Sequence, residues 1–198
     1  MTLIFSPVLL VIYPLILIII YISDGFPGLY KQQRVGKNGK SFLLYKFRTM
    51  DALSSDDVHQ EHYEKLSEKE TIEPSLTPSK PIRIENDDRI TNIGNFLRKT
   101  SLDELPNLIN VLRGEMSIVG PRPLFDDDTS TFDTKYMRRL NVLPGITGLL
   151  QINDRNTDEF EIWYKYDLLY IEQWSLALDL KIMLLTPKAL FTSKNKGL

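Results

Sequence analysis

Residues 87–124 read DDRITNIGNFLRKTSLDELPNLINVLRGEMSIVGPRPL, and this stretch carries the clearest structural pattern in the chain. It predicts a short helix that ends near Arg98, followed by an amphipathic helix with leucine and isoleucine on one side, which Gly114 closes. A short strand then runs into Gly120-Pro121-Arg122-Pro123, where two prolines fix the backbone around one arginine. Two helices followed by one short strand, together with the β-hairpin described below, predict an α+β fold.

Two adjacent acids, Asp103 and Glu104, lie at the start of the predicted amphipathic helix. Ser101-x-x-Glu104 matches a capping box, so helix stability is one explanation for them. The other explanation is chemical: a helix N-terminus favours an ionised carboxylate and offers free N–H groups to a phosphate. Mg²⁺ on the acids would reduce the repulsion between the carboxylate and the phosphate that it attacks. On this interpretation Asp103 is a nucleophile toward phosphorus.

A glycosidase pair is the weaker interpretation of the two acids. The carboxylates of a glycosidase flank the scissile bond and lie at least about 5 Å apart. Sequence neighbours on a helix point about 100° apart and cannot bracket a sugar in that way.

Phosphate chemistry needs cations near these acids, and the candidates are Arg98, Arg122, Lys46 and Arg48. Arginine suits the role because its planar fork can hold two phosphate oxygens at once. The rigid frame around Arg122 fits a pre-organised phosphate clamp, with a plain turn and an exposed arginine as the alternative.

Residues 29–50 predict a β-hairpin, because Asn38-Gly39 is a strong turn signal between two strand-like segments. Lys46 and Arg48 are expected to share one face of the second strand, either as an anion site or simply in contact with solvent. The opposite face of that strand is predicted to hold Leu43, Tyr45 and Phe47.

The N-terminal segment from Leu3 to Ile22 has no charged side chain and is about as long as a transmembrane helix. Pro7 and Pro14 interrupt it. The apolar part after Pro7 would give roughly 22 Å of helix, which is short for a hydrocarbon core of about 30 Å. A re-entrant helix, returning to the face from which it entered, therefore fits better than a single span. Basic residues after Asp24 indicate that the folded part faces the cytosol.

The C-terminal third predicts apolar helices, the last of which is expected to stop at Pro187. Such helices belong either in a core or at a membrane interface, and Trp and Tyr near the start favour the interface. Asp167 lies among aromatic residues, so it should pair with a basic residue or belong to a site. Arg155 is the expected partner.

Composition excludes several classes of protein. The chain of 198 residues has no cysteine, which rules out disulfides and thiolate chemistry, and its net charge of -2 gives no reason to expect a nucleic-acid partner. Residues 51–86, which include both histidines, are interpreted as a polar surface insertion without chemistry.

Taken in order, these segments resemble the bacterial sugar transferase family, the small monotopic phosphoglycosyl transferases. The matching segments are Phe5-Ser6-Pro7 and residues 34–50, 87–124, 143–156 and 166–186. The resemblance implies a mostly helical, membrane-associated α+β domain with a small β-hairpin and an N-terminal re-entrant helix broken at Ser6-Pro7.

The same resemblance implies a division into a membrane part, residues 1–24, and a cytosolic catalytic domain with interfacial C-terminal helices, residues 25–198. Only five residues precede Ser6, so the first limb of the re-entrant hairpin is expected to be shortened or absent. Leu143 stands where the family often has arginine, and Asp154 where it often has glycine. Both changes are expected to affect nucleotide or sugar contacts.

The implied activity transfers a sugar-1-phosphate from a UDP-sugar to polyprenyl (undecaprenyl) phosphate, through a phosphosugar bound to Asp103 and with release of UMP. Glu104 is the neighbouring acid, and both acids are expected to hold Mg²⁺. Six residues are expected to contact substrate or phosphate: Arg98, Arg122, Lys46, Arg48, Asp167 and Arg155. The site of action would be the cytoplasmic face of the bacterial inner membrane, in contact with lipid, at the first membrane step of glycan biosynthesis. A homodimer is left open, and the alternative is an inactive membrane-associated scaffold of the same fold.

Overall fold

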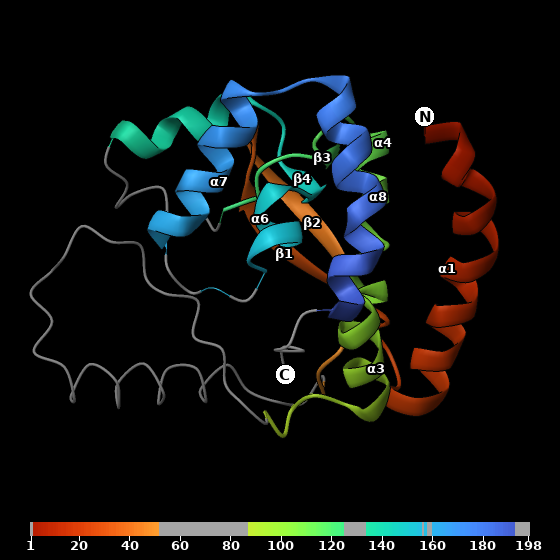
Figure 1. Ribbon diagram of the computed structural model, residues 1–198. Helices are drawn as coiled ribbons and strands as arrows, with labels where there is room; N and C mark the ends of the chain where they lie inside the picture. Colours follow the sequence, from red (N-terminus) through yellow and green to blue (C-terminus); the bar gives the residue numbers. More distant parts are fainter. Residues whose placement is uncertain (1, 52–86, 125–133, 156, 158–159, 193–198) are drawn as a thin grey trace, which may run out of the picture.

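The predicted β-hairpin is confirmed in the computed structural model, which describes residues 2–51, 87–124, 134–155, 157 and 160–192 (Figure 1). Strands β1 (Leu29–Val35) and β2 (Ser41–Phe47) pair antiparallel, with Leu29 opposite Phe47 and Val35 opposite Ser41. Asn38 and Gly39 in the connecting 3₁₀ turn both have positive φ, 59° and 73°, as a tight Asn-Gly turn requires.

Both faces of strand β2 carry buried apolar residues, whereas the predicted alternation placed apolar residues on one face only. Phe47 lies in a core cluster with Ile16, Ile20 and Leu97, on the face predicted to be apolar. Leu43 on that same face is 44% exposed. The face assigned to Lys46 and Arg48 instead carries buried apolar residues, which pack with Met116: Phe42 and Leu44.

The elements after the hairpin are arranged around it and around a second small sheet, and Figure 1 shows the C-terminal helices (blue) and the central helices (green) beside the strands. They are α3 (Asn92–Thr100), α4 (Asn107–Leu112), β3 (Ser117–Val119), the 3₁₀ segment η3 (Thr134–Asn141), β4 (Gly145–Thr147), α6 (Leu149–Asn153), α7 (Phe160–Glu172) and α8 (Leu176–Thr192). The mixed α+β class predicted from the sequence is confirmed.

The second sheet was not predicted from the sequence. Strands β3 and β4 pair in parallel, with Ser117 opposite Gly145 and Val119 opposite Thr147. A Cβ at position 145 would lie 2.1 Å from the backbone nitrogen of Gly120, so glycine is required there. Helices α7 and α8 cover this sheet through a cluster that contains Val119, Tyr170 and Ile182.

The predicted amphipathic helix is wrong in its first half. Helix α3 ends at Thr100, Ser101 adopts the left-handed conformation with φ 55°, and Leu102–Glu104 form a 3₁₀ turn, η2. The following helix α4 begins only at Asn107. Pro106 precedes it and has no N–H to continue the ladder from the 3₁₀ turn.

Helix α1 (Thr2–Asp24) continues through Ser6-Pro7, so the break predicted at this pair is not seen. Within the part of the chain that the structure describes, no helix combines the length and hydropathy needed to cross a membrane. Re-entry and the division at residue 24 remain predictions.

Helix α8 also continues past a proline, and the prediction that Pro187 ends it is wrong. Proline removes one backbone hydrogen bond from the helix. In the turn just before Pro187, the Thr186 hydroxyl donates to the Ile182 carbonyl at 2.8 Å.

Candidate active site

Asp103 and Glu104 lie in the 3₁₀ turn η2, between α3 and α4. The capping box expected at Ser101 is absent, because Ser101 is left-handed and its side chain caps no helix. The Ser101 hydroxyl instead accepts a hydrogen bond from Arg155 Nη2 at 2.7 Å. A residue 54 positions away in the sequence is thereby held next to the two acids.

The electrostatics of Asp103 differ from the expectation that a helix start keeps it ionised. Burial and, after it, the charge of Glu104 raise the pKa of Asp103 to about 6. Lys46, Arg98 and Arg155 act in the opposite direction and limit the rise. Asp103 has no hydrogen bond or ion pair to any residue in the described ranges, so both carboxylate oxygens are left for a ligand.

Glu104 behaves in the opposite way to its neighbour. Burial alone would raise the pKa of Glu104, but the charges of Lys46, Arg122 and Arg155 together lower it. Lys46 Nζ lies 2.8 Å from Glu104 Oε1 and forms an ion pair with it. At this site Glu104 is therefore held ionised, whereas Asp103 takes up a proton more readily.

The cations around the acids are fixed by bonds to different elements. Arg98 Nε donates to Thr49 Oγ1 at 2.8 Å, which ties α3 to the end of β2. Arg155 is fixed by Ser101, and Lys46 by Glu104. Ser101 and Thr49 were missed in the sequence analysis, because neither lies in a motif that indicates chemistry.

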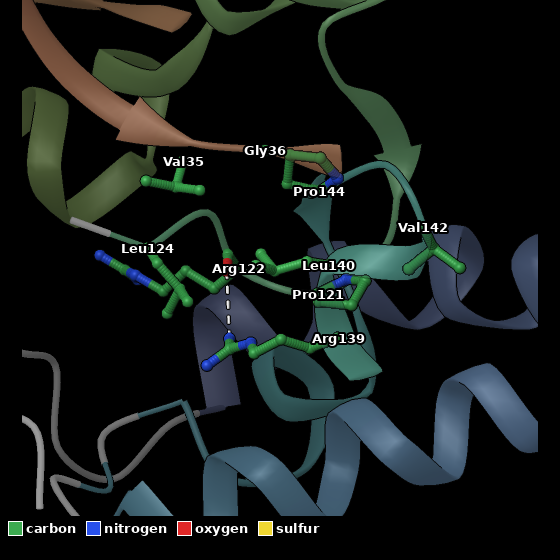
Figure 2. Close-up of a pocket in the computed structure, with 9 residues that line it drawn as sticks. All are labelled: Val35, Gly36, Pro121, Arg122, Leu124, Arg139, Leu140, Val142 and Pro144. Carbon is green, nitrogen blue, oxygen red and sulfur yellow. Dashed lines mark hydrogen bonds between the residues drawn. The ribbon is translucent and has the colours of Figure 1, made fainter. Parts of the chain in front are cut away.

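Arg122 is exposed between two buried prolines, Pro121 and Pro123. Its charge is among those that lower the pKa of Glu104, so it belongs to the same electrostatic site. Figure 2 shows a small pocket beside it and a hydrogen bond from Arg139 to the Arg122 carbonyl, at 3.1 Å. The pocket is lined by Val35, Gly36, Pro121, Arg122, Leu124, Arg139, Leu140, Val142 and Pro144.

The structure does not support a phosphate-binding role for Arg48. The Arg48 side chain is buried and its Nη2 donates to the carbonyls of Asp24 and Gly25, the latter at 2.9 Å. These carbonyls end helix α1, where a cation is favourable. Alternation along β2 therefore did not bring Lys46 and Arg48 to one anion site, because the end of α1 binds Arg48.

Asp167 has a different partner from the one expected. Its Oδ2 lies 2.6 Å from Arg139 Nη2, and the two side chains are only 4% and 1% exposed. Arg155 instead donates to Ser101 beside the two acids. Arg139 was not considered in the sequence analysis, although it belongs to the basic pair Arg138-Arg139.

The acids have the chemistry for a metal site with few protein ligands. No group of three or more His, Cys, Asp or Glu side chains suited to a metal occurs within the described residues. Mg²⁺ commonly uses one or two carboxylates together with water and substrate phosphates. The unbonded carboxylate of Asp103 fits this mode, with Glu104 beside it.

Comparison with known proteins gives the family. The bacterial sugar transferase profile matches residues 1–193, and the chain therefore belongs to the bacterial sugar transferase family. It is 39% identical to the exopolysaccharide production protein ExoY of Rhizobium meliloti, over 97% of this chain and 80% of that protein.

Two longer relatives have more specific names. The galactosyl transferase CpsE of Streptococcus agalactiae is 43% identical over 84% of this chain and 35% of CpsE. The UDP-glucose:undecaprenyl-phosphate glucose-1-phosphate transferase of Klebsiella pneumoniae is 39% identical over 96% of this chain and 39% of that enzyme. The chain thus spans little more than a third of the length of these two relatives.

Proposed function

We propose that this protein is a phosphoglycosyl transferase that moves a sugar-1-phosphate from a UDP-sugar to undecaprenyl phosphate. The observation that carries the proposal is an unbonded, half-buried carboxylate, Asp103, within the field of Lys46, Arg98 and Arg155. Cations on separate elements can neutralise a diphosphate while the carboxylate approaches phosphorus. The name of the Klebsiella relative, which gives UDP-glucose and undecaprenyl phosphate as its substrates, supports the same reaction.

In the first step a carboxylate oxygen of Asp103 attacks the phosphorus that carries the sugar. A bond forms between Asp103 and this phosphorus, and the bond from phosphorus to the bridging oxygen of the diphosphate breaks. UMP leaves with the bridging oxygen, and the sugar phosphate stays on Asp103. A pKa of about 6 leaves most Asp103 side chains ionised at neutral pH, as the attack requires.

In the second step a phosphate oxygen of the lipid attacks the same phosphorus and releases the Asp103 carboxylate. The product is a polyprenyl diphosphate sugar. Arg98, Arg122, Lys46 and Arg155 are the residues that we assign to phosphate binding in both steps. Asp103 and Glu104 would hold Mg²⁺, which supplies positive charge to the phosphates when bound.

Access to a lipid acceptor is supported by the surface of α1. One stripe of this helix, at Ile16 and Ile20, is buried against the hairpin and α3. The other side repeats apolar residues at helical spacing, all more than half exposed: Val11, Leu15, Ile18 and Ile22. An exposed apolar stripe of this length fits lipid better than water.

A similar stripe occurs on α8, at Leu176, Leu180 and Leu184, and Trp174 precedes it. Ile182 on the opposite side is fully buried. We assign both stripes to contact with the cytoplasmic face of the bacterial inner membrane, where a polyprenyl phosphate and a soluble UDP-sugar can both reach the site.

The test is UMP release by the purified full chain with Mg²⁺ and a panel of UDP-sugars, with and without undecaprenyl phosphate. UDP-sugar alone should give a protein mass increased by one sugar phosphate, located on Asp103. Asp103→Asn should abolish both signals, and Asp51→Asn, an exposed acid outside the site, should leave both unchanged. A sugar phosphate on another residue would contradict the mechanism. A folded protein that binds vesicles but releases no UMP with any UDP-sugar would favour the inactive scaffold.

A further inference from the structure

The turn that carries Arg122 is held at four consecutive carbonyls by different parts of the chain. The Pro121 carbonyl accepts from Gly145 N in β4 at 2.7 Å, and the Leu124 carbonyl accepts from Val35 N in β1 at 2.9 Å. Between them, two buried arginines donate to the other two carbonyls: Arg139 to Arg122 and Arg34 to Pro123. The turn is thereby fixed at every residue, while the Arg122 guanidinium itself stays exposed.

The donor to the Arg122 carbonyl depends on a third element. Nη2 of Arg139 lies 3.1 Å from that carbonyl and 2.6 Å from Asp167 Oδ2 in α7 (Figure 2 shows the first of these contacts). A guanidinium that is only 1% exposed requires an opposite charge to remain charged and ordered. Asp167 supplies that charge and touches neither Asp103 nor Glu104 within the described contacts.

We infer that Asp167 and Arg139 are positioning residues, which act on the donor diphosphate through Arg122. They form a buried relay from α7 to the turn that carries the exposed cation. This inference rests on the proposed function, since it takes Arg122 to bind a phosphate of the UDP-sugar. It changes the role of Asp167 from substrate contact to support of a substrate contact.

The matched control lies one residue away. Arg138 and Glu172 join the same two elements, η3 and α7, through an ion pair of 3.2 Å, but both side chains are more than half exposed. Among the hydrogen bonds and ion pairs of the described residues, this pair makes none to the Arg122 turn. Glu172→Gln therefore removes an ion pair between these elements without disturbing the relay.

The experiment is a double-mutant cycle on UDP binding, measured by calorimetry on the whole 198-residue chain with Arg122→Ala and Asp167→Asn. Asp167→Asn alone should weaken UDP binding roughly tenfold, equivalent to about 1.4 kcal/mol. In the Arg122→Ala background the same change should alter binding less than about twofold, because residues that act through one contact are not additive. Equal factors in both backgrounds, or no effect of Asp167→Asn on UDP binding, would overturn the inference.

A second measurement does not depend on any ligand. The amides of Gly145 and Val35 bond to the carbonyls at the two ends of the turn, so their hydrogen exchange reports its order. Asp167→Asn should speed their exchange, and Glu172→Gln should not. If hydrogen exchange at these two amides is unchanged in Asp167→Asn, the relay is wrong, even if the protein proves to be a transferase. If exchange is faster but the protein releases no UMP, the relay holds and the proposed reaction is wrong. If Asp167→Asn does not fold, Arg139→Lys replaces it, since lysine keeps the charge but not the length and planar shape that place Nη2 against both partners.

Discussion

Lys46 Nζ and Glu104 Oε1 lie 2.8 Å apart, and this pair joins strand β2 to the 3₁₀ turn that carries Asp103. The pairing gives the two adjacent acids different states. Glu104 is neutralised by a lysine, whereas Asp103 faces the surrounding cations without a bond to any of them in the described residues. Two neighbouring carboxylates can in this way serve as a supporting acid and a nucleophile.

Lys46→Met removes the partner of Glu104 and one of the charges that favour ionised Asp103. We expect kcat/KM for UMP release to fall by roughly tenfold or more, the usual cost of losing a hydrogen bond to a charged group. Steady-state kinetics with a fixed UDP-sugar would measure it. Lys40→Met, at an exposed position in the hairpin, should have no effect.

The rate should depend on pH through Asp103. Because the attacking group is the carboxylate, UMP release at constant Mg²⁺ should fall as the pH drops through the pKa of about 6. The charge of Glu104 raises the pKa of Asp103, so Glu104→Gln should shift the acid limb of the residual activity to lower pH. If the acid limb of the pH–rate profile moves to higher pH in Glu104→Gln, Asp103 is not the group whose ionisation controls the rate.

Substitutions at Ser101 distinguish the effect of its backbone conformation from the effect of its hydroxyl. Its φ of 55° is unfavourable for a residue with a Cβ, and its hydroxyl binds Arg155. Ser101→Gly and Ser101→Ala should lower UMP release equally, since both lose the hydroxyl. Thermal unfolding should nevertheless show the glycine variant as more stable than the alanine variant by about 1 kcal/mol.

Gly94 allows α3 to approach the end of β2. A Cβ at this position would lie 2.0 Å from the Thr49 carbonyl oxygen. Gly94→Ala should force α3 away from Thr49, destabilise the fold by about 1–3 kcal/mol and loosen the bond between Thr49 and Arg98. Denaturant unfolding measures the first effect. Asn92→Ala, at an exposed position on the same helix, should stay close to wild type.

The outer stripe of α1 should determine binding to lipid. Replacing Leu15 and Ile18 with serine leaves the buried residues Ile16 and Ile20 intact. Sedimentation with phosphatidylglycerol vesicles should show a large loss of binding, because roughly 1.5–3 kcal/mol is lost for each large apolar side chain no longer buried in lipid. Asn92→Ser, at an exposed and uncharged position in α3, serves as the control, and vesicle binding of the double variant equal to wild type would reject contact through α1.

Two glycine-dependent features of the local sequence were predicted correctly, whereas the helix start expected at Ser101 and the helix end expected at Pro187 were not. The hairpin depends on Asn38-Gly39, and the end of α4 on Gly114, whose φ is 72°. The site, by contrast, depends on pairs distant in sequence. Ser101 is left-handed beside Arg155, and Asp167 binds Arg139, neither of which a helical periodicity can indicate. The residue types of the site were predictable, but their partners were not.

The junction at the end of α1 also limits how this helix can move. Asp24 Oδ2 accepts from Thr91 Oγ1 at 2.7 Å, and Arg48 donates to the Asp24 and Gly25 carbonyls. Thr91 in turn caps α3, which holds Arg98. These bonds fix the position of α1 relative to the site. If α1 lies in lipid, the Asp103 carboxylate is therefore held at a constant distance from the bilayer. An acceptor diffusing in that bilayer would then find it by a search in two dimensions rather than three.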